Sequence, residues 1–174
     1  MPELEELRYP VGRFKMTEPF APAIHIAAIR ALPAELRASV AGLNDAQLDT
    51  PYRDGGWTVR QVVHHMADSH LNSFLRFKLA LTEDEPTIKP YMEAAWAKLP
   101  DSVGAPIELS LTLVEALHAR WVLLLQSLTP ADYERRFVHP ERGATTLAVN
   151  LAIYAWHGRH HVAHITGLRS RMGW

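Results

Sequence analysis

The chain has 174 residues, which suits a single domain with a substantial core. Hydrophobic residues make up 48% and charged residues 21%, values near the globular average that argue against a disordered chain. The formal net charge of −1 and the absence of a long basic run argue against a nucleic-acid partner and a polybasic membrane tether. Cysteine is absent, so disulfides, a thiolate nucleophile and cysteine-ligated metals are excluded.

Residues 1–20 are predicted to form an irregular arm, because proline and glycine interrupt any longer helix there. The arm lacks the apolar stretch of a signal peptide, and no segment approaches the roughly 18 apolar residues of a membrane span. We therefore expect a cytoplasmic protein without a membrane partner. From Ala23 to Leu43, apolar residues recur at helical spacing, which predicts a first long helix with a bend at Pro33.

The apolar spacing predicts three further long helices, at residues 58–81, 106–128 and 145–169. They begin at residues typical of helix N-termini, which are Thr58, Pro106, and Thr145 or Thr146. The connection at residues 82–105 is long, and the one at residues 130–144 is polar and rich enough in turn residues to contain a short hairpin. The sequence thus predicts one all-α domain over residues 1–174, an up-and-down four-helix bundle with long inter-helix connections.

The segment HGRHHVAHI places four histidines in the last predicted helix. Residues three and four apart share a helix face, so His157 with His161, or His160 with His164, can direct two imidazoles to one point. Imidazole is the commonest protein ligand for zinc and similar metals. Along this helix the inward stripe follows steps of four and three through Asn150, Tyr154, His157, His161, His164 and Leu168. Because an unpaired polar group in a core costs about 1–3 kcal/mol, such a stripe points to a bound ligand.

The second predicted helix supplies a partner from the segment HHMADSH. His64 and His65 lie about 100° apart around the helix, so only one of them can face the bundle axis squarely. His70 is five positions beyond His65, a poor register for a shared ligand set. We expect His64 and His70 at the helix surface. The remaining histidines are expected to be hydrogen-bonded core residues or half-exposed ones, namely His25, His118 and His139.

Three segments of the chain resemble those of the YfiT-type proteins of the DinB-like superfamily. They are PYRDGGWTVRQVVHHMADSHLNSFLRFKLAL, ELSLTLVEALHARWVLLL and YAWHGRHHVAHITGLRSRMGW, and together the resemblance covers nearly the whole chain. It implies a four-helix bundle in which three histidines hold one divalent metal per subunit, zinc or nickel. It also implies a metal-dependent hydrolase that forms homodimers. Related members are thiol S-transferases that use low-molecular-weight thiols such as bacillithiol.

The resemblance also implies the metal ligands. The family's first ligand lies eight residues after a tryptophan that opens the second helix, which here leads from Trp57 to His65. The other two are the first and last members of a His-x-x-His-His run, here His157 and His161. His164, one turn further along, would then orient a ligand or face the substrate. The register of His160 with His164 remains the alternative.

Three neutral imidazoles leave a fourth metal position open for water or substrate, and a divalent metal lowers the pKa of such a water towards about 7. The same position could instead activate a thiol.

Asp68 is a candidate general base or ligand-orienting group, and Asn150 and Tyr154 are candidates for contacting substrate. Arg53 is a candidate for binding an anionic group of a small-molecule substrate. A hypothesis of another class is a non-catalytic bundle that uses the metal for stability, dimerisation or regulation.

Overall fold

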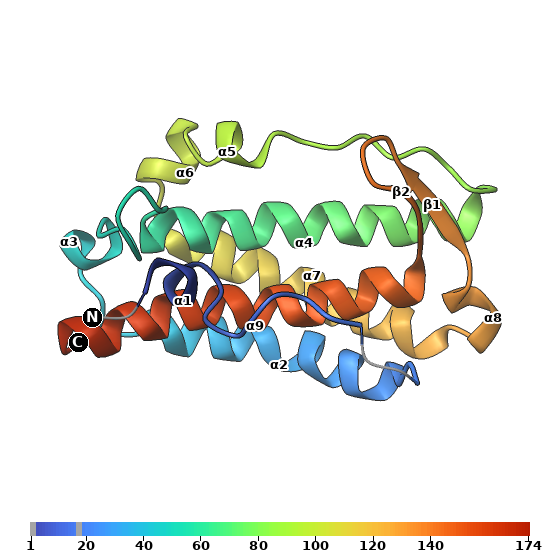
Figure 1. Cartoon of the computed structure of the whole chain (residues 1–174), viewed down its shortest axis with the longest axis horizontal. Helices are drawn as coiled ribbons and strands as arrows, with labels where there is room; N and C mark the ends of the chain where they lie inside the picture. The colour runs from blue at the N-terminus through green and yellow to red at the C-terminus, as the bar shows by residue number, and fades with distance from the viewer. Residues whose placement is uncertain (1–2, 17–18) are drawn as a thin grey trace.

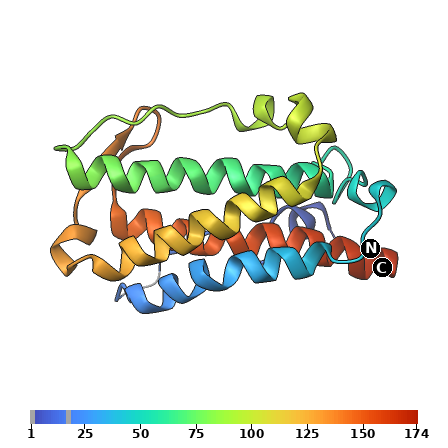
Figure 2. The ribbon, with the colours of Figure 1, turned by 180° about the vertical axis from the view of Figure 1, so that it is seen from behind.

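The computed structural model describes residues 3–16 and 19–174, so residues 1, 2, 17 and 18 of the predicted arm lie outside the described part. In that part, four long helices form a bundle (Figures 1 and 2), which confirms the predicted all-α four-helix bundle. They are α2 (Pro22–Val40), α4 (Val59–Thr82), α7 (Ile107–Ser127) and α9 (Leu147–Met172). Helix α2 continues through Pro33, as predicted. None of the helices described is long and apolar enough to cross a membrane.

The connections carry short elements. The short helices of the described chain are α1 (Leu4–Arg8), α3 (Asp45–Leu48), α5 (Glu93–Trp96), α6 (Pro100–Gly104) and α8 (Pro130–Tyr133). The predicted hairpin is confirmed as the antiparallel strands β1 (Arg136–His139) and β2 (Gly143–Thr146), with Arg136 opposite Thr146 and His139 opposite Gly143. The prediction of an irregular arm over residues 1–20 is wrong at residues 4–8, which form the short helix α1. There the Glu6 carboxylate accepts a hydrogen bond from the Glu3 backbone N–H at 3.1 Å and stabilises one helical turn.

The predicted up-and-down order of the four long helices is wrong. Helices α4 and α7 run in the same direction, opposite to α2 and α9 (Figure 1). Helix α2 packs against α7 and α9, and α4 packs against the same two helices. Residues 83–106, which we call the crossover, return along the outside of α4 before α7 begins (Figure 1). This long connection allows two successive helices to be parallel, which a short loop does not.

The helices that carry the histidines begin at clear capping signals. Thr58 Oγ1 accepts a hydrogen bond from the Gln61 N–H at 3.1 Å, and Gln61 Oε1 accepts one from the Thr58 N–H at 2.9 Å. In α9, Thr146 Oγ1 accepts from the Val149 N–H at 3.2 Å. These caps satisfy backbone donors at the start of both helices and thereby fix where each histidine falls along the bundle.

The core is divided into two apolar clusters. One surrounds Trp121 near the hairpin, and the other surrounds Met66 near α3. Between them lies a layer of buried histidines from three helices: His65 and His70 of α4, His118 of α7, and His161 of α9. The bundle therefore places polar groups at mid-height, where an ordinary bundle would carry leucine or isoleucine.

Candidate metal centre

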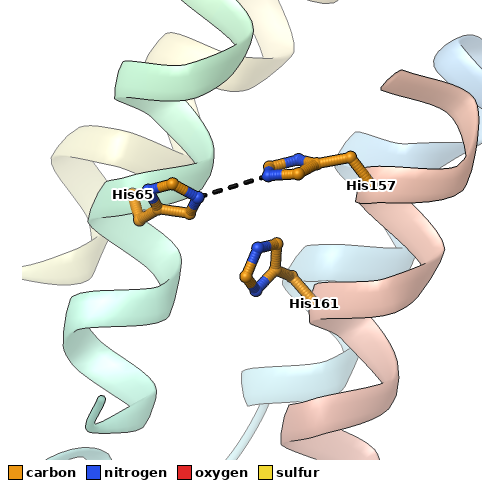
Figure 3. Close-up of side chains that lie close together, drawn as sticks. All are labelled: His65, His157 and His161. Atoms are coloured by element: carbon orange, nitrogen blue, oxygen red, sulfur yellow. Dashed lines mark hydrogen bonds between the residues drawn. The ribbon is translucent and has the colours of Figure 1, made fainter. Parts of the chain in front are cut away.

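Three imidazoles from two neighbouring helices converge in the interior. His65 comes from α4, and His157 and His161 come from α9, four residues apart on one face (Figure 3). Each offers one ring nitrogen, and these three atoms lie within 4.8 Å of one another. His65 Nε2 and His157 Nε2 are 3.2 Å apart. The two ligands predicted on α9, His157 and His161, thus lie close to His65.

Burial keeps these imidazoles neutral. It lowers the pKa of His65 to about 4, with a further lowering from His160. The pKa values of His157 and His161 lie well below the usual histidine range, because the surrounding protein desolvates both rings and each faces other imidazoles. A neutral imidazole has a lone pair on one ring nitrogen, which is the form that binds metal.

A second group of histidines shares His161. The ligand atoms of His160, His161 and His164 also lie within 4.8 Å of one another. His164 Nδ1 is 3.4 Å from His161 Nδ1, and the His164 ring stacks on Tyr52 with a centroid distance of 4.0 Å. His164 therefore lies behind His161, on the side away from His65.

The prediction that His64 and His70 lie at the helix surface is wrong. His70 is fully buried and contacts both His157 and His118. His64 is also buried, with its Nδ1 2.7 Å from Ser110 Oγ and its Nε2 3.2 Å from the Ala105 carbonyl. Hydrogen-bond partners on α7 and at the end of the crossover satisfy His64, and this allows it to remain inside the protein.

A cavity of about 690 Å³ opens beside the three histidines. His65, His157 and His161 all line it, whereas His164 does not. The opposite wall comes from the crossover, with Tyr91 and Glu93 among its residues, and the far end comes from the hairpin and Arg76 of α4. A small molecule in this cavity would therefore lie against the three imidazoles. Largely irregular segments supply these walls, so no periodic pattern in the sequence predicts them.

Two of the predicted catalytic candidates line the cavity. Asn150 is buried, and its Nδ2 donates to Ser73 Oγ at 2.9 Å. Tyr154 Oη accepts a hydrogen bond from Ser69 Oγ at 3.3 Å, and the Tyr154 ring packs 5.4 Å from that of His157. Burial raises the pKa of Tyr154, so the phenol keeps its proton near neutral pH. Tyr154 thus presents a hydrogen-bond donor close to the imidazoles.

Two other candidates do not line the cavity. Asp68 is half-buried, and no hydrogen bond links its carboxylate to a ring of the histidine groups in the described chain. Burial first, and the charge of Asp101 second, raise the pKa of Asp68 to about 6. Arg53 Nη1 donates to the Asp54 carbonyl at 2.8 Å, and the guanidinium lies 5.4 Å from the centre of the Tyr52 ring. Both residues lie outside the cavity lining.

Residues 28–165 match the DinB superfamily, and the chain belongs to this superfamily. Relatives from Bacillus mycoides (strain KBAB4) and from Bacillus cereus are each 56% identical over 174 residues. The match covers 98% of this chain and 100% of each relative. Both relatives carry the name "Putative metal-dependent hydrolase". The resemblance seen in the sequence is thereby confirmed.

Solved structures support the same assignment. YfiT from Bacillus subtilis, described as "a probable metal-dependent hydrolase with an unusual four-helix bundle topology", is 50% identical to this chain. The match covers 97% of this chain and 99% of YfiT, with a TM-score of 0.94. TT2238, "a four-helix bundle protein", is 19% identical over 88% of this chain and 100% of its own, with a TM-score of 0.58. At that identity TT2238 shows the shared fold alone.

Proposed function

We propose that the protein is a metal-dependent hydrolase that holds one divalent ion, zinc or nickel, on His65, His157 and His161. The observation that carries this proposal is the convergence of three neutral imidazoles at the wall of a cavity. Nitrogen ligands about 2.1 Å from a tetrahedral zinc ion lie about 3.4 Å from one another. The 3.2 Å between His65 Nε2 and His157 Nε2 suits this spacing. The names of the relatives point the same way.

Three protein ligands favour catalysis over a purely structural role, because structural zinc sites use four. When bound, a divalent ion supplies Lewis acidity and lowers the pKa of water at its open position. The three histidines line the cavity, so a small-molecule substrate there would lie next to that position.

Tyr154 is proposed to act on the substrate directly. Because Ser69 Oγ donates to Tyr154 Oη, the phenolic proton stays available for a second partner in the cavity. Donated to a carbonyl oxygen of the substrate, this proton would stabilise the negative charge that develops during hydrolysis. Asn150 is proposed to contact the substrate one helical turn from Tyr154 on the same face of α9, with its side-chain amide oriented by Ser73.

Metal binding is tested first. Purified protein, the variants His65→Ala and His161→Ala, and a control variant His25→Ala are loaded with zinc or nickel and analysed for metal content. We expect one ion per chain in the wild type and in His25→Ala, and a large loss in the other two. His25 suits as a control because it stacks on Phe20, away from the cavity. Wild-type metal content in His65→Ala and His161→Ala would contradict the ligand assignment.

The reaction is tested on the loaded protein with a panel of esters and amides, with and without a low-molecular-weight thiol. Hydrolysis without the thiol, lost on chelation and regained with metal, supports the proposal. Turnover only in the presence of the thiol would show an S-transferase instead. Metal binding without any turnover would indicate a non-catalytic bundle. Light scattering during size-exclusion chromatography checks the expected homodimer.

A further inference from the structure

Two chains of hydrogen-bonded imidazoles lead from the proposed ligands to backbone carbonyls. The first, which we call the inner relay, runs from His157 through His70 and His118 to the Ile29 carbonyl of α2. His157 Nδ1 is 3.2 Å from His70 Nε2, His70 Nδ1 is 3.0 Å from His118 Nε2, and His118 Nδ1 is 2.6 Å from the Ile29 oxygen. The second, the outer relay, runs from His161 Nδ1 to His164 Nδ1 at 3.4 Å and from His164 Nε2 to the Arg8 oxygen at 3.2 Å.

The carbonyl at the end of the inner relay fixes each proton in turn. A carbonyl oxygen only accepts hydrogen bonds, so His118 Nδ1 carries the proton. In a neutral imidazole the other nitrogen is then bare, which makes His118 Nε2 an acceptor and requires a proton on His70 Nδ1. By the same reasoning His70 Nε2 is bare and the proton of His157 sits on Nδ1. The lone pair of His157 is left on Nε2, the atom that faces His65.

The outer relay gives the same result for the other ligand from α9. The Arg8 carbonyl requires the proton of His164 on Nε2, so His164 Nδ1 is an acceptor. The facing nitrogen, His161 Nδ1, must then carry the proton of His161. The lone pair of His161 is left on Nε2, on the side of His65 and His157 (Figure 3).

Burial favours the neutral rings that this reasoning needs. His70, His118 and His164 are all buried, with 0%, 1% and 4% of their surface exposed, and a charged ring is costly in such surroundings. Each ring also has a partner on both nitrogens, so no buried nitrogen of His70, His118 or His164 is left without a contact.

We propose that His118, His70 and His164 are positioning residues that hold the tautomers of His157 and His161 with both Nε2 lone pairs directed to one point. This inference rests on the proposed metal site and goes beyond its three ligands. It assigns a function to three histidines that touch neither the ion nor the substrate. The proposal also gives helix α1 a role, because the carbonyl of its last residue, Arg8, ends the outer relay. Losing the partner of a ligand imidazole typically lowers metal affinity 10- to 100-fold.

Histidine tautomers in the metal-free protein test the proposal directly. The protein is labelled with ¹⁵N-histidine, and long-range ¹H–¹⁵N correlation spectra report which ring nitrogen carries the proton. We expect the proton on Nδ1 of His157 and on Nδ1 of His161. A proton on Nε2 of either ring in the wild type would overturn the proposal. This readout needs no metal and no substrate, so it is independent of the proposed hydrolase activity.

Variants separate the two relays. His118→Leu removes the acceptor of His70, so the protons of the inner relay can shift and His157 can place its proton on Nε2. We expect this shift together with a 10- to 100-fold loss of zinc affinity. His118→Gln, whose amide can donate to Ile29 and accept from His70, should restore the tautomer and most of the affinity. His164→Leu should shift His161 and leave His157 unchanged.

If these histidines only supported packing, either leucine variant would change the tautomers of His157 and His161 together, because loosened packing does not distinguish the two relays. The same change of His157 and His161 in both leucine variants would therefore overturn the proposal. So would wild-type tautomers together with wild-type zinc affinity in His118→Leu and His164→Leu. If the wild type binds no zinc, the proposed function fails, and the tautomers of the metal-free protein still decide on the relays.

Discussion

Gly158 of α9 lies directly against Leu32 of α2. A Cβ atom at Gly158 would be 2.6 Å from Leu32 Cδ2 and 2.9 Å from Leu32 Cδ1, so a methyl group would clash with a fully packed side chain. We expect Gly158→Ala to lower the free energy of unfolding by about 1–3 kcal/mol, because overpacking outweighs the better helix propensity of alanine. Urea denaturation measures this change.

Gly167 provides the matched control in the same helix. A Cβ atom there would meet only the end of the Arg171 side chain, at 3.4 Å. We expect Gly167→Ala to raise the free energy of unfolding by up to about 1 kcal/mol through helix propensity. If both alanine variants have the same stability, the close approach of α2 and α9 does not determine the residue at position 158.

The role proposed for Tyr154 predicts a kinetic change without a change in metal binding. Tyr154→Phe removes the phenolic donor while keeping the ring beside His157, so we expect kcat to fall about 100-fold and zinc affinity to stay unchanged. Tyr133→Phe is the control, because Tyr133 Oη donates to the Leu125 carbonyl at 2.8 Å and lies outside the cavity lining. Equal kcat values for the two variants would count against Tyr154 as a donor to substrate.

Asp68 predicts a pH dependence of stability. Its pKa is raised from 3.8 to about 6, so between these values the folded state holds a proton that the unfolded state has lost. Stability from this group is therefore fully present below pH 3.8 and is lost as the pH rises through about 6. The full difference corresponds to about 3 kcal/mol, and solvent screening of a half-buried carboxyl reduces this to about 1 kcal/mol.

We therefore expect Asp68→Asn to be more stable than the wild type by about 1 kcal/mol at pH 7 and equally stable at pH 4. Chemical denaturation at both pH values measures the difference. Asp101→Asn should reproduce only a small part of it, because burial is the larger cause of the raised pKa. A stabilisation of Asp68→Asn that is the same at both pH values would contradict the pKa assignment.

Arg60 predicts unequal effects at its two carboxylate partners. The buried guanidinium donates from Nε to Asp49 at 2.7 Å and from Nη2 to Asp45 at 2.8 Å, yet the Asp45 side chain is 89% exposed and that of Asp49 51%. We expect Asp45→Ala to cost about 0–1 kcal/mol and Asp49→Ala about 1–3 kcal/mol. Thermal denaturation ranks the variants, and the reverse order would show that Asp45 is the main partner of Arg60.

The sequence predicted the helices and part of the site for a clear physical reason. Apolar periodicity marks a helix face without reference to distant residues, so the long helices were correct to within a few residues. The same periodicity showed that His157 and His161 face the core. In α7, His118 follows the stripe of Val114, Trp121 and Leu125 in the same steps of four and three. This periodicity is consistent with the expected core position of His118, but it does not indicate that His118 contacts His70 of another helix.

Other features could not be read from local patterns. Helix direction depends on how the crossover returns along α4, and its sequence carries no periodicity that records this path. His70 is buried because His118 and His157 approach it from other helices. The spacing of residues within α4 does not reveal those neighbours. The cavity likewise depends on segments that meet only in the folded chain.

Apart from Trp57, the cavity lining outside the long helices comes from the crossover and the hairpin. Loops accept insertions and substitutions more readily than packed helices. Changes at the crossover residue Tyr91 or at Arg142 of the hairpin would therefore alter what the cavity admits while leaving the imidazoles untouched. If the proposed metal site is the active site, its ligands and the loops that shape the cavity lie in separate stretches of the polypeptide, so exchanging the loops is a practical route to redesign.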